Sequence, residues 1–155
     1  MLTWHCQTFN ELSNNNLYNL LKLRSDVFVV EQNCIFPDLD NLDTLPDTRH
    51  LFALQDNKLV AYARLLAKGD SYLGYTSIGR VVVAKKSRKD KIGHTLMAHA
   101  IEETLKLWPD SPIKIGAQSH LEGFYQSHGF ITVSEPYMED GIEHYLMTRE
   151  TEVSL

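Results

Sequence analysis

The sequence predicts a single domain of the mixed α/β class, with elements in the order β-α-β-β-β-α-β-α-β-β. Apolar residues recur at helical spacing in two long segments, and short apolar or alternating runs between them indicate strands. The runs 78–84 and 113–117 flank the second helical segment, and this strand-helix-strand order favours a parallel pair with a right-handed crossover. At 155 residues with 43% hydrophobic content, the chain has the size of one ordinary domain.

The first half is predicted to hold three strands and one helix. The strands are residues 2–9, 51–54 and 59–66. Residues that recur at helical spacing after an Asn-rich segment predict the helix: Leu17, Leu20, Leu21, Arg24, Val27 and Phe28. Residues 33–47 lose this pattern and are predicted as an acidic loop with two prolines. Asp56-Asn57 is predicted as the turn of a hairpin.

The second half is predicted to complete the sheet around two helices. The strands are residues 75–84, 113–117, 130–134 and 143–149. A long helix begins at Gly93 and is ended by Pro109, and a short helix at 121–128 is ended by Gly129. Residues 80–84 and 113–117 are expected side by side and parallel, and the last two strands as an antiparallel pair.

Composition excludes several classes of protein. Asp and Glu outnumber Lys and Arg by 20 to 15, so the chain lacks the broad basic surface that extended nucleic acid requires. Cys6 and Cys34 match no metal or disulfide spacing, and no metal site is expected, since His94 and His99 also lack ligand spacing. No segment reaches the length of a membrane span, and the N-terminus has no signal-peptide pattern. A cytoplasmic protein is expected.

A basic cluster indicates an anion site. Five of the 15 Lys and Arg residues lie within Lys85 to Lys91, between a predicted strand and a predicted helix start. The first-turn N–H groups of a helix are unpaired and lie at the positive end of its dipole. On an acidic protein, this favours a small polyanion such as a nucleotide or coenzyme. A solvated basic turn is the alternative.

Known phosphate-binding motifs limit which class of anion the loop would bind. GxxxxGK[ST] and GxGxxG are both absent. Arg88-x-x-Lys91-Ile92-Gly93 resembles the coenzyme A loop of the GNAT superfamily of N-acetyltransferases, with Lys91 in place of the first glycine. Downstream, Tyr125 followed after three residues by Gly129-Phe130 resembles the second signature of that superfamily. The order of elements over roughly residues 1–150 suits it as well.

Further stretches resemble the ElaA-like branch of that superfamily. They are Leu23-Arg24, Val27 to Gln32, Asp40, Asp43, Asp47 to His50, and Ile78 to Val81. The spacing of Arg24 and Phe28, followed by acidic residues, is also similar to acyl-homoserine lactone synthases. A lactone synthase is therefore one alternative function, and a coenzyme-binding module without turnover is another.

The resemblance implies a GNAT fold, in which a central twisted mixed β-sheet with parallel, splayed middle strands is flanked by helices. It also implies transfer of an acetyl group from acetyl-CoA to an amine, by direct attack in a ternary complex and without a metal. The coenzyme contacts carried over are Val81, Val82, Val83, Arg88, Lys89, Lys91, Ile92, Gly93, His94, Ser119 and Phe124.

Two catalytic residues are expected. Tyr125 is the candidate acid, since a phenol stays protonated at neutral pH and the resemblance implies a place beside the sulfur; a half-buried core aromatic is the alternative. Glu31 is the candidate base, because partial burial and the helix C-terminus would raise its pKa; a solvent-facing glutamate is equally consistent. His120 and His144 are reserve candidates.

The acceptor is expected to be a cationic amine, either a small molecule or a peptide N-terminus. Six acidic residues and no Lys or Arg lie between Arg24 and Arg49, although a solvated loop explains the same charges. The candidate acceptor-binding residues are Arg24, Phe28, Asp40, Asp43, His50, Arg80 and His120. Arg24 and Arg80 alternatively pair with these carboxylates and organise the site. A homodimer stays open, because the sequence does not determine the oligomeric state.

Overall fold

The structure is a computed structural model that describes residues 1–151. Its first half contains β1 (Leu2–Gln7), α1 (Asn14–Arg24), a π-helical turn (Ser25–Glu31) that continues α1, β2 (Arg49–Gln55) and β3 (Lys58–Leu66). Its second half contains β4 (Ser77–Val83), α2 (Ile92–Leu107), β5 (Ile113–Gln118), α3 (Glu122–Gln126), β6 (Ile131–Thr132), β7 (Tyr137–Glu139) and β8 (Ile142–Arg149). The predicted mixed class is confirmed, and β7 is the strand that the sequence did not reveal.

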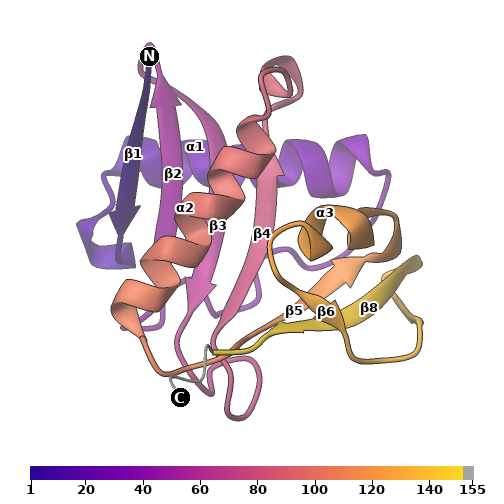
Figure 1. Ribbon diagram of the computed structural model, residues 1–155. Coiled ribbons are helices and arrows are strands. Elements are labelled where there is room, and N and C mark those ends of the chain that lie inside the picture. The colour runs from indigo at the N-terminus through magenta and orange to yellow at the C-terminus, as the bar shows by residue number, and fades with distance from the viewer. Residues whose placement is uncertain (152–155) are drawn as a thin grey trace.

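The strands form two antiparallel sheets, where one central sheet was expected. The first has the order β1-β2-β3-β4, and the second has the order β5-β8-β6 with β7 paired to β8. Among residues 1–151, the backbone link between β4 and β5 is one parallel bridge, Thr76 with Ile113. The expected parallel ladder between 80–84 and 113–117 is therefore wrong. Figure 1 shows the two strands running on in different directions, so their backbones cannot pair further.

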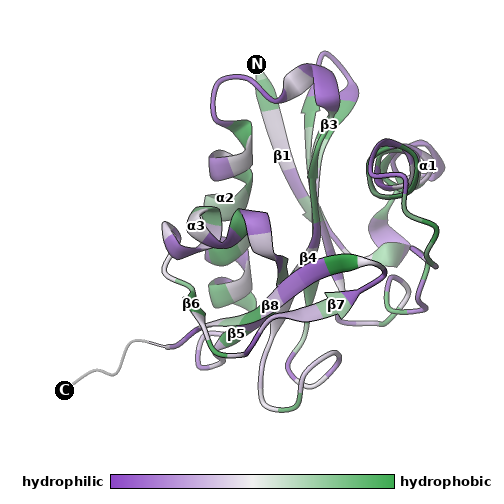
Figure 2. Cartoon of the chain, turned by 90° about the vertical axis from the view of Figure 1, so that its right-hand side faces the viewer, coloured by the Kyte–Doolittle hydropathy of each residue, from purple (hydrophilic) through white to green (hydrophobic). Residues whose placement is uncertain are grey.

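Two helices cover opposite faces of the first sheet, as Figure 2 shows. On the α2 face, Ala61, Ala63 and Leu65 of β3 pack in the main core with buried residues of α2. On the α1 face, Phe52 and Tyr62 pack against Leu20 of α1. The period-2 alternation of a strand produces this division, so Arg64 of β3 also lies on the α1 face.

Local signals explain most element ends. Ser13 caps α1 by accepting from the Asn16 N–H at 3.0 Å, so the helix begins before the predicted first apolar position. Asp56 and Asn57 have φ of 50° and 64°, the left-handed pair that a type I′ hairpin turn requires, which confirms the predicted turn. Gly129, with φ 92°, follows α3 as predicted.

No helix among the described residues combines the length and apolar character that crossing a membrane demands.

Candidate active site

The loop between β4 and α2 has the backbone geometry of an anion site. Lys91 is the N-cap of α2 in the left-handed region, with φ 57° and ψ 32°, and Asp90 before it has φ 61°. Glycine adopts this conformation at no steric cost, whereas a lysine costs about 1 kcal/mol. The lysine at the expected glycine position therefore keeps the glycine-like backbone. Ile92 and Gly93 follow as the first residues of α2, where N–H groups have no intrahelical acceptor.

Gly93 is not required by packing within the protein. A Cβ added there would meet the Phe124 ring at 3.8 Å, an ordinary van der Waals distance. Phe124 in turn lies beside His94, with ring centroids 4.7 Å apart, and His94 shares a 2.9 Å hydrogen bond with His128. Three predicted coenzyme contacts, Gly93, His94 and Phe124, are thus neighbours where α2 begins beside α3.

Arg88 and Glu31, predicted for the coenzyme and for proton transfer, are bonded to each other. The Arg88 guanidinium donates to both Glu31 carboxylate oxygens at 2.7 and 2.9 Å, and its Nε donates to the Val83 carbonyl at 3.0 Å. The expected direction of the Glu31 pKa shift is wrong. Its hydrogen bond to Arg88 lowers the pKa of Glu31, because the bond favours the charged form.

Tyr125 is buried in the main core, with 8% of its surface exposed. Its ring meets Phe124 and Phe130 edge-on, at centroid distances of 5.1 and 6.0 Å. Burial raises the pKa of Tyr125 to about 12, so its O–H persists throughout the neutral range. The residue lies on α3, and that helix contacts β5.

The strand β4, which holds the predicted coenzyme contacts Val81 to Val83, keeps one edge open. Val82 is buried on the α1 face, whereas Val81 and Val83 pack partly against the main core. Within residues 1–151, β4 pairs along one edge with β3 and has no strand partner on its other edge after the Thr76 bridge. Lys89 is exposed, and Ser119 begins the short 3-10 turn after β5.

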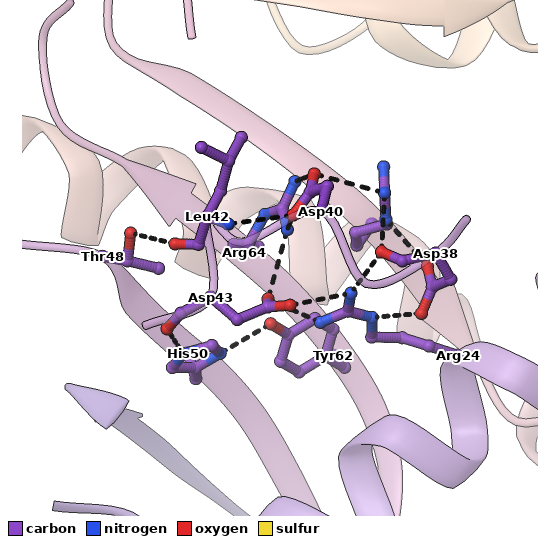
Figure 3. Close-up of polar contacts among 10 residues, drawn as sticks. Arg24, Asp38, Asp40, Leu42, Asp43, Thr48, His50, Tyr62 and Arg64 are labelled. Atoms are coloured by element: carbon purple, nitrogen blue, oxygen red, sulfur yellow. Dashed lines mark hydrogen bonds and ion pairs between the residues drawn. The ribbon is translucent and has the colours of Figure 1, made fainter. Parts of the chain in front are cut away.

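A buried ion network occupies the α1 side of the first sheet (Figure 3). Arg24, fully buried, bonds Asp38 at 3.0 Å and Asp43 at 2.7 Å. Arg64 bonds Asp40 at 2.8 Å and Asp43 at 3.2 Å. Hydrogen bonds from these guanidinium groups lower the pKa of both Asp40 and Asp43 against an opposing effect of burial.

Arg80 and His50 complete this network. Arg80 donates to Asp38 at 2.8 Å, and His50 lies between the Tyr62 hydroxyl at 2.7 Å and the Asp43 carbonyl at 3.0 Å. Burial lowers the pKa of His50, and it stays neutral. The aspartates expected to attract the acceptor are thus charge-matched by arginines, which supports the organising role foreseen for Arg24 and Arg80.

Arg80 also sits at a strained point of β4. Its φ is 51°, and the register between β3 and β4 shifts between Tyr62 and Arg64, opposite this residue. A non-glycine residue in the left-handed region costs roughly 1–3 kcal/mol and persists where its surroundings hold it, as the bonds to Asp38 do here.

The remaining candidates lie apart from the network or at its border. Phe28 packs partly buried against the α1-side core, and His120 is exposed. His144 is buried in β8, with Nδ1 2.7 Å from the Ile142 carbonyl. No group of three or more His, Cys, Asp or Glu residues in the described chain is arranged to hold a metal ion.

Comparison with known proteins identifies the family. The profile described as "Acetyltransferase (GNAT) domain" matches residues 40–151. The chain belongs to this GNAT acetyltransferase family. Within the GNAT proteins it is homologous to Protein ElaA of Escherichia coli (strain K12), 49% identical over 150 residues, which cover 97% of each chain. The predicted family and branch are confirmed.

Solved structures have the same fold as this chain. The crystal structure of Escherichia coli ElaA has a TM-score of 0.90 at 48% identity and covers 97% of this chain and 100% of that one. An acyl-CoA N-acyltransferase from Pseudomonas aeruginosa has a TM-score of 0.91 at 43% identity, with 96% and 99% covered. A CoA-dependent acyl-homoserine lactone synthase, BjaI, reaches 0.80 at 18% identity, with 98% and 84% covered, which shows a shared fold alone.

Sequence reasoning missed Tyr62 and Arg64 in the ion network, and it counted Asp38 among the acidic residues of the loop without naming it as a site residue. One signal was present, since Arg64 interrupts a strand that is otherwise almost wholly apolar from Leu59 to Leu66. A charged residue in a buried strand needs a partner, but Asp56 and Asp70 lie nearer to Arg64 in the sequence than Asp40 and Asp43 do, so the sequence did not indicate which carboxylates it would meet.

Proposed function

We propose that this protein transfers an acetyl group from acetyl-CoA to a primary amine, by direct attack of the amine on the thioester in a ternary complex. The observation that supports this best is the loop at the start of α2, where a left-handed Lys91 precedes the N–H groups of Ile92 and Gly93, which have no intrahelical acceptor, among basic side chains. Several N–H groups at a helix start bind a pyrophosphate well.

The pantetheine arm is proposed to lie along the open edge of β4. Peptide groups on that edge have no strand partner in the described chain after Thr76, so an extended ligand with amide groups can add to it as a strand does. Strand N–H groups near Val81 to Val83 would then bond the pantetheine and polarise the thioester carbonyl.

In the chemical step, the amine nitrogen forms a bond to the thioester carbon and the carbon–sulfur bond breaks. The nitrogen loses a proton to a base, and the sulfur leaves as a thiolate. Tyr125 is proposed as the group that hydrogen-bonds this thiolate and supplies its proton. This role needs a phenol that keeps its O–H at neutral pH, and Tyr125 does so.

Glu31 is proposed as the base, under the control of Arg88. While the pair is closed, Arg88 holds the carboxylate in its charged, weakly basic form. Coenzyme phosphates compete for the same guanidinium, since arginine binds phosphate and carboxylate with the same bidentate geometry. Coenzyme binding would therefore release Glu31 and let its pKa rise.

The experiment is a mass-spectrometric screen of acetyl-CoA with polyamines, amino acids, aminoglycosides and peptides. An acetylated amine is the expected product. For the Tyr125→Phe variant, we expect kcat to fall roughly 100-fold while acetyl-CoA binds within about twofold of the wild type. Absence of product across the panel contradicts the transferase, and unchanged turnover in the variant removes Tyr125 from the mechanism.

The lactone synthase alternative keeps only the fold likeness to BjaI in its favour. Lactone formation from longer acyl donors, with no activity on acetyl-CoA, would favour it over the proposal.

A further inference from the structure

One face of β5 carries a glycine that the core does not cover. Ile113, Ile115 and Ala117 are buried in the main core with α2, so by strand alternation Gly116 points to the opposite face of the second sheet. Gly116 is exposed. It lies three residues after the Ile113 bridge and pairs with Leu146 of β8.

Two tyrosine hydroxyls converge above this glycine. A Cβ added at Gly116 would lie 2.9 Å from the Tyr137 oxygen and 3.4 Å from the Tyr72 oxygen. The two oxygens are therefore at most about 6 Å apart, a span that one ligand atom bridges with two hydrogen bonds. Neither hydroxyl forms a hydrogen bond to another residue within 1–151. Tyr72 lies in the β3–β4 connection, and Tyr137 lies in β7.

A carboxylate accompanies the two phenols. Burial and the nearby Glu139 raise the pKa of Tyr72, and burial, Tyr72 and Glu139 raise the pKa of Tyr137 to about 12. Both phenols therefore stay neutral, with oxygen lone pairs that accept hydrogen bonds. The Glu139 carboxylate lies 3.6 Å from Nε2 of His144, and the His144 ring stacks on Tyr137.

Charges of both signs lie near this face. Glu139 is on the same side of the β7–β8 hairpin as Tyr137, whereas Glu143 is on the other side and Glu122 bonds Thr132. The Lys114 ammonium lies over the Tyr75 and Tyr72 rings, at 4.6 and 5.5 Å from their centroids. This cation–π contact involves the face of the Tyr72 ring and not its hydroxyl, so the hydroxyl can still bind a ligand.

We propose that Gly116, Tyr72, Tyr137 and Glu139 form the binding site for a primary alkylammonium group, the amine of the acceptor. Two phenol oxygens and a carboxylate match the three N–H donors of such a group. The absence of a side chain at Gly116 suits an unbranched amine that approaches the strand backbone. The assignment of this amine as the one acetylated rests on the proposed function, whereas its binding does not.

This site replaces the acidic loop as the source of attraction for the acceptor. Asp38, Asp40 and Asp43 are charge-matched by buried arginines, but no printed ion pair neutralises Glu139 with an arginine or lysine in the described chain.

The test is titration calorimetry of n-butylamine against the protein with coenzyme A, which carries no acetyl group. We expect Tyr72→Phe, Tyr137→Phe and Glu139→Gln each to weaken binding about fivefold or more. Gly116→Ala should abolish it, because the added Cβ would crowd the Tyr137 oxygen. Butyltrimethylammonium should bind more weakly than butylamine, because it has no N–H donor.

Two control variants match these changes. Tyr18→Phe removes a hydroxyl from an exposed tyrosine of α1, and Glu143→Gln removes a carboxylate from the same hairpin. Glu143 pairs with Met138 and therefore faces away from Tyr137 and His144. Both controls should bind butylamine as the wild type does.

The outcomes separate this inference from the proposed function. Butylamine that fails to bind the wild type, or binds equally to all variants, overturns the site, as does equal binding of butyltrimethylammonium. Binding that depends on Tyr72, Tyr137 and Glu139 supports the site, even where acetyl transfer is absent and the proposed function fails. Transfer with an unchanged KM in the variants supports the function and overturns the site.

Discussion

At the residue scale, two side chains with separate predicted roles are one unit. Arg88 was expected at the coenzyme phosphates and Glu31 at the acceptor amine, yet a bidentate ion pair joins them. The pair is partly exposed, so a phosphate from the coenzyme can compete for the arginine. We therefore propose that binding of the coenzyme and the protonation state of Glu31 are linked.

This linkage gives opposite effects for one substitution. In Glu31→Gln, Arg88 loses its carboxylate competitor, and we expect acetyl-CoA to bind a few-fold more tightly. The same variant loses the base, so kcat should fall by roughly 100-fold. Calorimetry with acetyl-CoA and steady-state kinetics measure the two effects. Weaker coenzyme binding, or an unchanged kcat, argues against competition between Glu31 and the coenzyme for Arg88.

Lys91 stands where the coenzyme A loop motif has its first glycine. Without that glycine, it was open how closely the loop backbone could approach a phosphate. The structure answers that Lys91 adopts the left-handed conformation itself, so the loop keeps its shape and gains a charge.

At the element scale, the ion network fixes the loop 33–48 against α1, β3 and β4. Asp43 is bound by both Arg24 and Arg64. In the same loop, the Thr48 hydroxyl donates to the Leu42 carbonyl at 2.8 Å. Buried pairs of this kind stabilise little relative to apolar residues, but losing one partner leaves a buried charge without compensation.

Asp43→Asn should therefore destabilise the protein by about 3 kcal/mol. Asp47→Asn is the matched control, since Asp47 is exposed in the same loop, and its effect should stay within about 0.5 kcal/mol. Urea unfolding of both variants measures the free energies. Equal stability of the two would show that the network does not hold the loop.

His50 adds a pH dependence to this element. Burial lowers its pKa in the folded state, so the unfolded state binds the proton more readily. The free energy of unfolding should therefore decline as pH falls below about 6.5, by at most ~1.4 kcal/mol per pH unit. Urea unfolding at pH 7.5 and 5.5 tests this. His50→Asn is expected to reduce the decline but not to remove it, because burial also lowers the pKa of His128, and the exposed His120→Asn is expected to leave the decline unchanged.

At the scale of the whole molecule, the two sheets share one hydrophobic core, although a single backbone bridge links their strands. Polar contacts also tie the segment after α1 to the second sheet. The Gln32 and Gln118 amides bond each other at 3.3 and 3.5 Å, and the Cys34 thiol donates to the Asp140 carbonyl at 3.2 Å. These contacts join the end of the π-helical turn and the following loop to β5 and the β7–β8 hairpin.

Coenzyme binding should raise the thermal stability of the whole protein, because the coenzyme binds the folded state and not the unfolded state. At 100 times the dissociation constant, the gain is about 2.7 kcal/mol, or roughly 5–10 °C in Tm for a chain of this size. Thermal unfolding with and without coenzyme A measures it. Arg88→Glu should show a much smaller shift than Lys106→Glu, a control at the far end of α2; equal shifts would remove Arg88 from the coenzyme site.

The sequence by itself determined the elements and the family. Apolar spacing set α2 and the strands, the Asp56-Asn57 turn set the β2–β3 hairpin, and two short motifs indicated a GNAT protein. These features are local, because a helix period or a turn depends on residues near in sequence. The strand β7, which spans only Tyr137–Glu139, was missed.

Only the tertiary structure decided which side chains meet. Arg24 lies 19 residues from Asp43, Glu31 lies 57 from Arg88, and Tyr72 and Tyr137 reach Gly116 from separate elements. No local pattern encodes such pairs, since they arise where the packing of α1 and the two sheets brings distant backbone together. The same packing divided the expected single sheet in two, because β4 and β5 leave their one bridge in different directions.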